Sequence, residues 1–291
     1  MRHAPKKKCC TRENATKQGS FRRKSDSQRI QRFRCKTCSK SFSLATFHPA
    51  YYQKKRHLNH DCKLLLASCV SMRRIGIALN IHPITVARKL KYLAQQARTH
   101  DMALIPAYPS FTAIQLDELQ SIEHTKCKPL SIVIVVAENG RKILDFRVAI
   151  MPATGHLAKI SRHKYGPRDD TRRENLHDLL KNLQPQLSPS ISIRSDECPM
   201  YKSAVKKYFP KAHYEQFKGR KSSVAGQGEL KKGWRDPLFC INHTFAMLRA
   251  NINRLVRKTW CTTKRITRLI DHLYVYCWVH NSMLTPALPP A

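Results

Sequence analysis

Residues 112–119 read Thr112-Ala113-Ile114-Gln115-Leu116-Asp117-Glu118-Leu119, a β-rich run that carries two adjacent acids. A second run of this kind, at 191–194, leads directly into Ser195-Asp196-Glu197. The chain of 291 residues contains only 19 Asp and Glu residues against 54 Lys and Arg residues. Because acid is so scarce, acids at two strand ends indicate metal ligands more than solubilising charge.

The segments around these two runs alternate between β-rich and helical patterns. Three β-rich runs, at 112–119, 130–137 and 143–150, are separated by short turns, which favours an antiparallel meander. The stretch 154–173 is polar and is interpreted as loop-like. The remaining segments are predicted to be helix, strand, helix, strand and two closing helices, at 172–187, 191–194, 201–209, 213–217, 241–258 and 263–280.

This order of elements is that of an RNase H-like domain, whose sheet carries one acid on its first strand and another at the end of its fourth. Asp117 and Asp196 fall on those two strands. Carboxylate oxygens suit Mg²⁺ or Mn²⁺, and two such ions support displacement at a phosphodiester. We therefore expect Asp117 and Asp196 to be catalytic metal ligands. Glu118 and Glu197, one residue further on, are expected to point to the opposite face.

A third ligand is expected from a helix after the last strand, and two residues compete for this role. Asn242 opens the helix predicted at 241–258, where an amide oxygen can bind a divalent ion. It is also a good N-cap residue, and the two roles can coexist. Glu229 is a carboxylate, but it lies in a Gly-containing stretch that is interpreted as a loop. We favour Asn242.

The predicted helix at 241–258 also carries a polar stripe beside its apolar one. Helical spacing places the stripe residues on one face, which is expected to meet metal at its start and DNA phosphate further on. The members of this stripe are Asn242, Arg249, Asn253 and Arg257.

The formal net charge of +35 indicates a polyanionic partner, and nucleic acid is the usual one. The N-terminus is rich in Lys with no apolar core behind it, and no apolar run approaches the length of a membrane span. The sequence therefore predicts a cytoplasmic, nucleoid-associated protein with reduced thiols and no membrane partner.

The first 50 residues are basic and poor in large aliphatic side chains, so they need a staple in order to fold. Cys35-Lys36-Thr37-Cys38 offers two thiolates to one Zn²⁺ ion, after a short strand at 31–34. Cys10 is the upstream candidate, but Cys9 and Cys10 are adjacent rather than separated by two residues. His3, or the group His57, His60 and Cys62, is an alternative source of ligands.

Residues 54–98 are predicted to be helical and to contain a helix-turn-helix. A short helix at 72–80 is followed by a turn, because Pro83 disfavours helical angles at His82 and suits the first turn of a new helix. The new helix buries Val86, Leu90 and Leu93 on one face. Other positions are expected to contact a DNA major groove, namely Thr85, Arg88, Lys89 and Lys91. An ordinary helical hairpin is the alternative.

The chain resembles bacterial insertion-sequence transposases that combine a zinc ribbon, a helix-turn-helix and an RNase H-like catalytic domain. Residues 248–261 are similar to the helix that follows the third catalytic position in the insertion sequence one group. Residues 31–38 with Phe42 resemble the second half of that group's ribbon. The family's third acid maps onto Asn242. The resemblance implies cleavage of element ends by water, attack of the freed 3′-hydroxyl on target DNA, and a homo-oligomer assembled on double-stranded DNA.

The sequence thus predicts an α+β multidomain protein. A zinc-ribbon-like segment is expected at 1–50, a helix-turn-helix domain at 51–100 and an RNase H-like catalytic domain at 110–285, with Mg²⁺ or Mn²⁺ and Zn²⁺ as cofactors. The predicted function is that of a metal-dependent DNA transposase. The alternative is a catalytically inactive DNA-binding protein or regulator derived from one.

Overall fold

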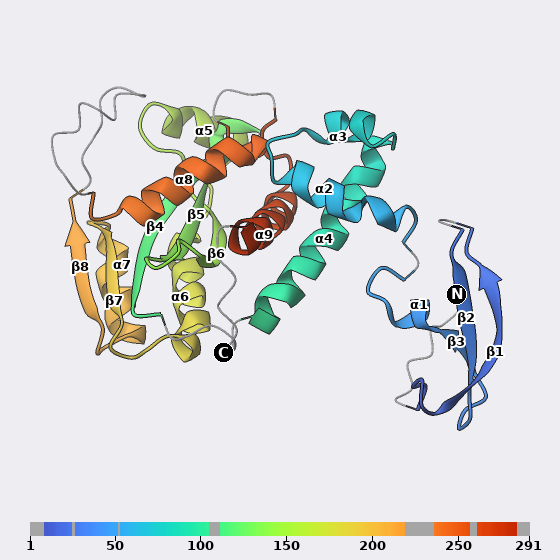
Figure 1. Ribbon diagram of the computed structural model, residues 1–291. Coiled ribbons are helices and arrows are strands. Elements are labelled where there is room, and N and C mark those ends of the chain that lie inside the picture. The colour runs from blue at the N-terminus through green and yellow to red at the C-terminus, as the bar shows by residue number, and fades with distance from the viewer. Residues whose placement is uncertain are drawn as a thin grey trace. The chain divides into compact units, whose positions relative to one another are not determined.

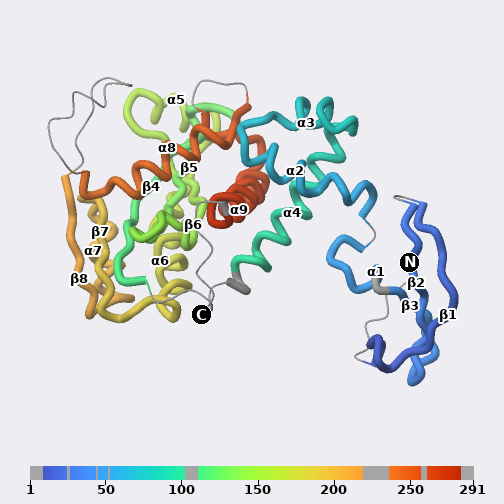
Figure 2. The backbone as a smooth tube through the Cα atoms, viewed as in Figure 1, coloured from blue at the N-terminus to red at the C-terminus, as the bar shows by residue number. Residues whose placement is uncertain are grey.

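The computed structural model describes residues 9–24, 27–51, 53–104, 111–218, 236–256 and 261–283 (Figures 1 and 2). The chain divides into two compact units, Met1–Asp61 and Cys62–Ala291. It contains helices and two β-sheets, so the prediction of a mixed helical and β protein is confirmed. The predicted limits of the three domains stay predictions.

The first unit is built on a small antiparallel sheet in the order β1-β2-β3. Its strands are β1 (Ala15–Arg22), β2 (Arg29–Cys35) and β3 (Ser41–Ser43), and the short helices α1 (Leu44–Phe47) and η1 (Arg56–Leu58) follow. Phe33 and Phe42 stack with their ring centroids 5.7 Å apart and form the core together with cysteine side chains. A core this small is consistent with the need for a metal staple.

The second unit begins with a helical segment made of α2 (Asn59–Leu66, from Cys62 on), α3 (Met72–Ala78) and α4 (Pro83–Leu104). As predicted, α4 starts at Pro83. The turn before it contains Asn80 in the left-handed region, at φ +47°. Gly76 allows a close approach there, because a Cβ atom on it would lie 2.7 Å from the carbonyl oxygen of Ile81.

The main sheet of the second unit has the strand order β6-β5-β4-β7-β8. Its strands are β4 (Ala113–Glu123), β5 (Thr125–Ala137), β6 (Ile143–Ile150), β7 (Ser192–Asp196) and β8 (His213–Phe217). The first three strands pair antiparallel and form the predicted meander. In contrast, β7 runs parallel to both β4 and β8.

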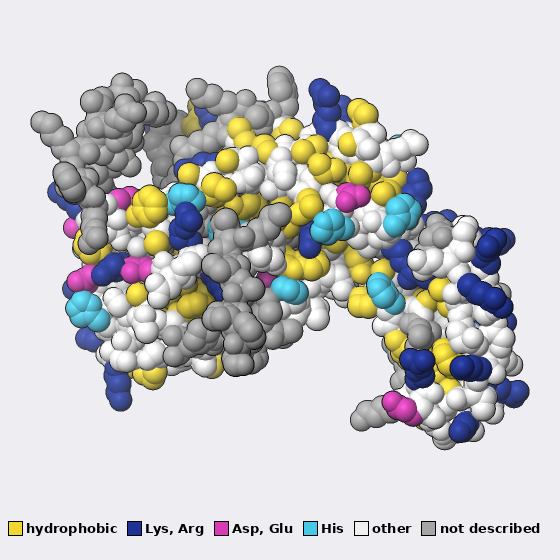
Figure 3. Space-filling model, viewed as in Figure 1, with side chains coloured by type: hydrophobic (Ala, Val, Ile, Leu, Met, Phe, Trp, Pro, Cys, Tyr) yellow, Lys and Arg dark blue, Asp and Glu magenta, His cyan; other side chains and the backbone are white. Residues whose placement is uncertain are grey.

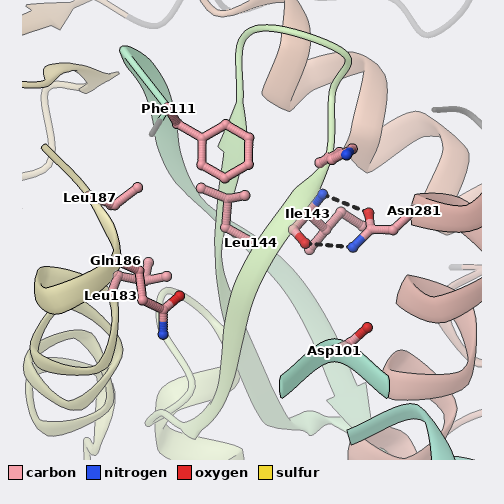
Figure 4. Close-up of a pocket in the computed structure, with 9 residues that line it drawn as sticks. Asp101, Phe111, Ile143, Leu144, Leu183, Gln186, Leu187 and Asn281 are labelled. Carbon is pink, nitrogen blue, oxygen red and sulfur yellow. Dashed lines mark hydrogen bonds between the residues drawn. The ribbon is translucent and has the colours of Figure 1, made fainter. Parts of the chain in front are cut away.

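Helices pack on both faces of this sheet. One buried cluster joins it to α8 (Phe239–Asn251) and α9 (Ile266–Met283), and the other joins it to α6 (Arg172–Leu183) and α7 (Pro199–Tyr208). Figure 2 shows α8 running across β4 and β5. Asn281 of α9 also holds the start of β6, because its amide group bonds to the backbone N–H and C=O of Ile143 at 3.0 and 2.8 Å (Figure 4).

Two sequence-based expectations about the helices are wrong. The stretch 154–173 is not only loop, because it contains α5 (Leu157–Tyr165). The helix predicted at 241–258 ends at Asn251 and is followed by a 3₁₀ turn, η5 (Asn253–Leu255). A further 3₁₀ turn, η3 (Gln184–Gln186), follows α6.

Candidate metal site and nucleic-acid interface

Asp117 and Asp196 lie side by side on neighbouring parallel strands. The register of β4 and β7 pairs Gln115 with Arg194 and Leu116 with Ser195, so the next residues along both strands are the two acids. Neighbouring strands lie about 4.8 Å apart, which places both backbones within reach of a shared ion. We call Asp117 and Asp196 the acid pair.

The acid pair faces the side of the sheet that α8 covers. Side chains alternate along a strand, and Leu116 and Ile193 belong to the cluster under α6 and α7. Leu119 belongs to the cluster under α8 and α9. Asp117 lies two residues before Leu119 and therefore faces the same side as Leu119. Asp196 lies three residues after Ile193 and therefore faces the side opposite to Ile193. Both acids thus point toward α8.

The surroundings of the acid pair disfavour two negative charges. Burial and the charge of Asp196 together raise the pKa of Asp117 to about 7, against a lowering effect from the backbone N–H of Glu118, which donates to Oδ1 at 2.6 Å. Burial also raises the pKa of Asp196, whose Oδ1 accepts from the backbone N–H of Cys198 at 3.2 Å. Two carboxylates in such a place fit a divalent cation, because the cation would offset their repulsion.

The neighbouring acids, Glu118 and Glu197, act on the pair through their charges, which raise the pKa of Asp117 and Asp196 respectively. Glu118 points to the other face of the sheet, where Arg172 Nη1 lies 3.9 Å from its carboxylate. Glu197 is exposed to solvent. This placement agrees with the expectation for Glu118, whereas the direction of Glu197 stays a prediction. As an exposed acid next to Asp196, Glu197 is a convenient control position.

Gln115 fixes the start of α8 against the strand that carries Asp117. It is 3% exposed, and its Oε1 accepts from the backbone N–H of Ile241 at 2.9 Å. Its Nε2 donates to the carbonyl of Pro237 at 2.9 Å and to Glu138 at 3.1 Å. A polar residue buried in a strand two positions before an acid was the only sequence signal for this anchoring role, and sequence reasoning missed it.

Asn242, the favoured third ligand, bonds to Asp236 through its amide nitrogen, and its role as a metal ligand stays a prediction. It is the fourth residue of α8, so it does not serve as the N-cap, which is Leu238. Its Nδ2 donates to Asp236 Oδ2 at 2.8 Å, while Asp236 Oδ1 accepts from the backbone N–H of Leu238 at 3.0 Å. The rival ligand, Glu229, lies outside the described residues.

Arg249 is the α8 residue whose charge acts on the acid pair, since it lowers the pKa of Asp117. The predicted polar stripe does not continue beyond it as a helical face. Asn253 lies in η5, after the end of α8, and Arg257 lies outside the described residues. The reason is that Ile252 adopts an extended conformation, with φ −114° and ψ 104°, which ends the helix.

In the segment from α3 to α4, which the sequence predicts to be a helix-turn-helix, some of the predicted DNA contacts are exposed and another is buried. Arg88 and Lys91 are exposed and Thr85 is half-buried, all on α4. Lys89 is only 2% exposed, so it cannot belong to the surface that would meet a groove, and we remove it from that set. Figure 3 shows Lys and Arg side chains over much of the visible surface of the first unit as well.

A cluster of four cysteines lies in the first unit. The Sγ atoms of Cys9, Cys10, Cys35 and Cys38 all lie within 4.8 Å of one another, and those of Cys10 and Cys38 are 3.5 Å apart. Four thiolates about 2.3 Å from a zinc ion stand about 3.8 Å apart, so the cluster fits tetrahedral Zn²⁺. The pKa of Cys38 is lowered to about 7, mainly by the backbone N–H of Lys40, which favours a thiolate.

The fourth sulfur comes from Cys9, which sequence reasoning had set aside because it adjoins Cys10. Adjacent cysteines can both contribute because the loop before β1 turns at this point, and Asn14 Nδ2 holds the Cys9 carbonyl at 2.8 Å. His57 and His60 do not belong to the cluster, and Cys62 begins the second unit. His3 lies outside the described residues.

Comparisons with known proteins add little to this geometry. No protein-family model and no curated protein matches the sequence. Among solved structures, the chain is similar to one in the crystal structure of a pre-cleavage Mos1 transpososome, with 10% identity over 84% of this chain and 80% of that chain, and a TM-score of 0.21. A TM-score this low carries no argument. Within the described residues, no helix has the length and apolar character needed to cross a bilayer.

Proposed function

We propose that this protein is a metal-dependent DNA transposase of an insertion sequence, with an RNase H-like domain as its catalytic part. The observation that carries the proposal is the acid pair, two half-buried carboxylates on adjacent parallel strands with a raised pKa at both. The strand order β6-β5-β4-β7-β8, with three antiparallel strands followed by two parallel ones, supports the assignment.

Asp117 and Asp196 would hold Mg²⁺ or Mn²⁺, which would activate the attacking oxygen and offset charge on the phosphate. The chain's own contribution is placement. Gln115 fixes α8 to β4, and Arg249 brings a positive charge toward Asp117. That charge would also attract the phosphate backbone of DNA. Arg88 and Lys91 of α4 would bind element ends, and a homo-oligomer on two DNA ends is part of this proposal.

A catalytically inactive DNA-binding protein is the second candidate, and one observation favours it. Asn242 donates its amide to Asp236, and no described hydrogen bond joins it to the acid pair. The helix therefore supplies the pair with a cation, Arg249, without an observed third oxygen ligand.

Cleavage of a supercoiled plasmid in Mg²⁺ or Mn²⁺ separates the two candidates. We expect Asp196→Asn to lower metal-dependent nicking at least 100-fold, because the substitution removes a ligand charge while it keeps the shape. The matched control is Glu197→Gln, which changes the exposed neighbouring acid and should retain activity. Equal nicking by the parent and Asp196→Asn would reject the acid pair as the catalytic site. Metal-independent DNA binding without any nicking would favour the second candidate.

A further inference from the structure

A cavity of about 250 Å³ lies on the same face of the sheet as the acid pair. It is lined by the end of β4, the start of β5, the segment between β6 and α5, the first residue of α5, and η5. Ser121 in its wall is four residues after Asp117 on β4, so it faces the same side of the sheet about 13 Å further on. The polar residues used below are Ser121, Lys126, Thr154, Arg254 and Thr262.

Arg254 brings a positive charge to this cavity without a carboxylate to match it. Its Nε donates to His272 Nδ1 at 3.2 Å, and the other ring nitrogen of His272 bonds to the carbonyl of Leu66 at 2.7 Å. His272 is 2% exposed, and burial lowers its pKa to about 4, so it is neutral at pH 7. A neutral ring accepts a hydrogen bond but does not offset the charge of the guanidinium.

The nearby carboxylate of Asp271 is already committed to other cations. It pairs with Arg98 at 3.2 Å and with Arg268 Nη1 through its other oxygen. Among the described residues, no salt bridge joins Arg254 to an acid, and no Asp or Glu lines the cavity. Burial and the charge of Arg268 lower the pKa of Arg254, and the smaller opposing effects of Cys261 and Asp271 do not offset them.

An anion in the cavity would remove this cost. A planar guanidinium binds the oxygens of a phosphate through paired hydrogen bonds, and hydroxyl groups and an ammonium group in the wall add donors. The cavity lies further along β4, the strand that carries Asp117. A nucleic-acid strand bound at the pair would therefore bring further phosphates toward it.

We propose that Arg254 and the cavity around it bind a backbone phosphate of the DNA strand that passes over Asp117 and Asp196. This inference rests on the proposed nucleic-acid function, and it assigns a role to a residue outside the acid pair and the helix-turn-helix. The ligand class is a phosphodiester.

The salt dependence of DNA binding tests the proposal without catalysis. A fluorescein-labelled 30-base-pair duplex of mixed sequence is titrated with the zinc-loaded protein, without Mg²⁺ or Mn²⁺, at 50–200 mM NaCl. Each lost phosphate contact makes the slope of log K against log salt shallower by about 0.9. The ratio of the parent's DNA affinity to that of Arg254→Gln should therefore fall about 3.5-fold between 50 and 200 mM NaCl. Lys207→Gln, on exposed α7 under the opposite face, should retain the parent slope.

Ser121→Glu is the second variant, because it places a carboxylate beside Arg254 and leaves the bond to His272 intact. It should reproduce the reduced slope even where Arg254→Gln does not fold. If the salt slope of DNA binding by Ser121→Glu equals that of the parent, the proposal is overturned.

Inorganic phosphate distinguishes a backbone site from a site for free phosphate. If phosphate at matched ionic strength raises the melting temperature of the parent and not that of Ser121→Glu, while the two DNA slopes are equal, the cavity binds free phosphate and the backbone assignment is overturned. If the two variants show a reduced salt slope while the parent shows no nicking at all, the phosphate site is retained and the enzymatic function is rejected.

Discussion

Asp101 illustrates how a single buried carboxylate sets a pH dependence. It lies near the end of α4 at the edge of a pocket with largely apolar walls (Figure 4). Burial and the charge of Asp145 together raise its pKa to about 7. Between the ordinary pKa of 3.8 and about 7 the native state binds more protons than the unfolded state, so the free energy of unfolding falls as pH rises through this window.

Asp101→Asn should therefore stabilise the protein at pH 8 by up to about 4 kcal/mol and have little effect near pH 4. The amide keeps the size of the side chain but cannot ionise. Urea unfolding of parent and variant at both pH values measures the difference. Asp169→Asn, at an exposed acid, is the control. A variant whose stability runs parallel to that of the parent across this range would contradict the assignment.

At the same scale, some site residues could be predicted from the sequence and others could not. Asp117 and Asp196 were found because each ends a β-rich run, and strand alternation fixes which way they point. Cys9 and Gln115 were missed because their roles depend on contacts with distant residues, Cys35 and Ile241. The bond from Asn242 to Asp236 was also missed, because sequence spacing does not show how a chain enters a helix.

Among the elements, strands were easier to predict than helix ends. The strands β4, β5 and β6 are long apolar runs separated by turns, which leaves few alternatives. In contrast, α5 was missed because it is short and three basic residues fill its last turn, so that it resembles the polar stretch around it. The length of α8 was overestimated because Ile252 and Leu255 are buried and continue its apolar spacing, although the backbone is no longer helical there.

The helix-turn-helix depends on the close approach of α3 to the turn before α4. A Cβ atom at Gly76 would meet the Ile81 carbonyl oxygen at 2.7 Å and the Pro83 ring at 3.4 Å. Gly76→Ala should therefore destabilise the segment by about 1–3 kcal/mol, in spite of the better helix propensity of Ala, and weaken DNA binding. Ile77→Ala changes a side chain that is 77% exposed on the same helix and should be nearly neutral. Thermal unfolding and DNA titration measure both effects, and an unchanged Gly76→Ala variant would show that the turn can widen.

On the scale of the whole molecule, the division into two compact units predicts two separate responses to metal removal. The first unit has a small core of two aromatic rings and cysteine side chains, whereas the second has large apolar clusters on both faces of its sheet. Zinc binding should thus contribute much of the stability of the first unit and little of that of the second.

Calorimetry of the full chain should show two transitions, and a chelator should lower or abolish only the one that belongs to the first unit. Cys9→Ser should have the same effect and should lower bound zinc below one ion per chain, because a hydroxyl replaces one of four thiolates. Cys69→Ser, at an exposed thiol outside the cluster, should retain both zinc and the transition. If Cys9→Ser kept one tightly bound zinc ion, three sulfurs with a different fourth ligand would be sufficient, and the adjacent cysteines would not both be ligands.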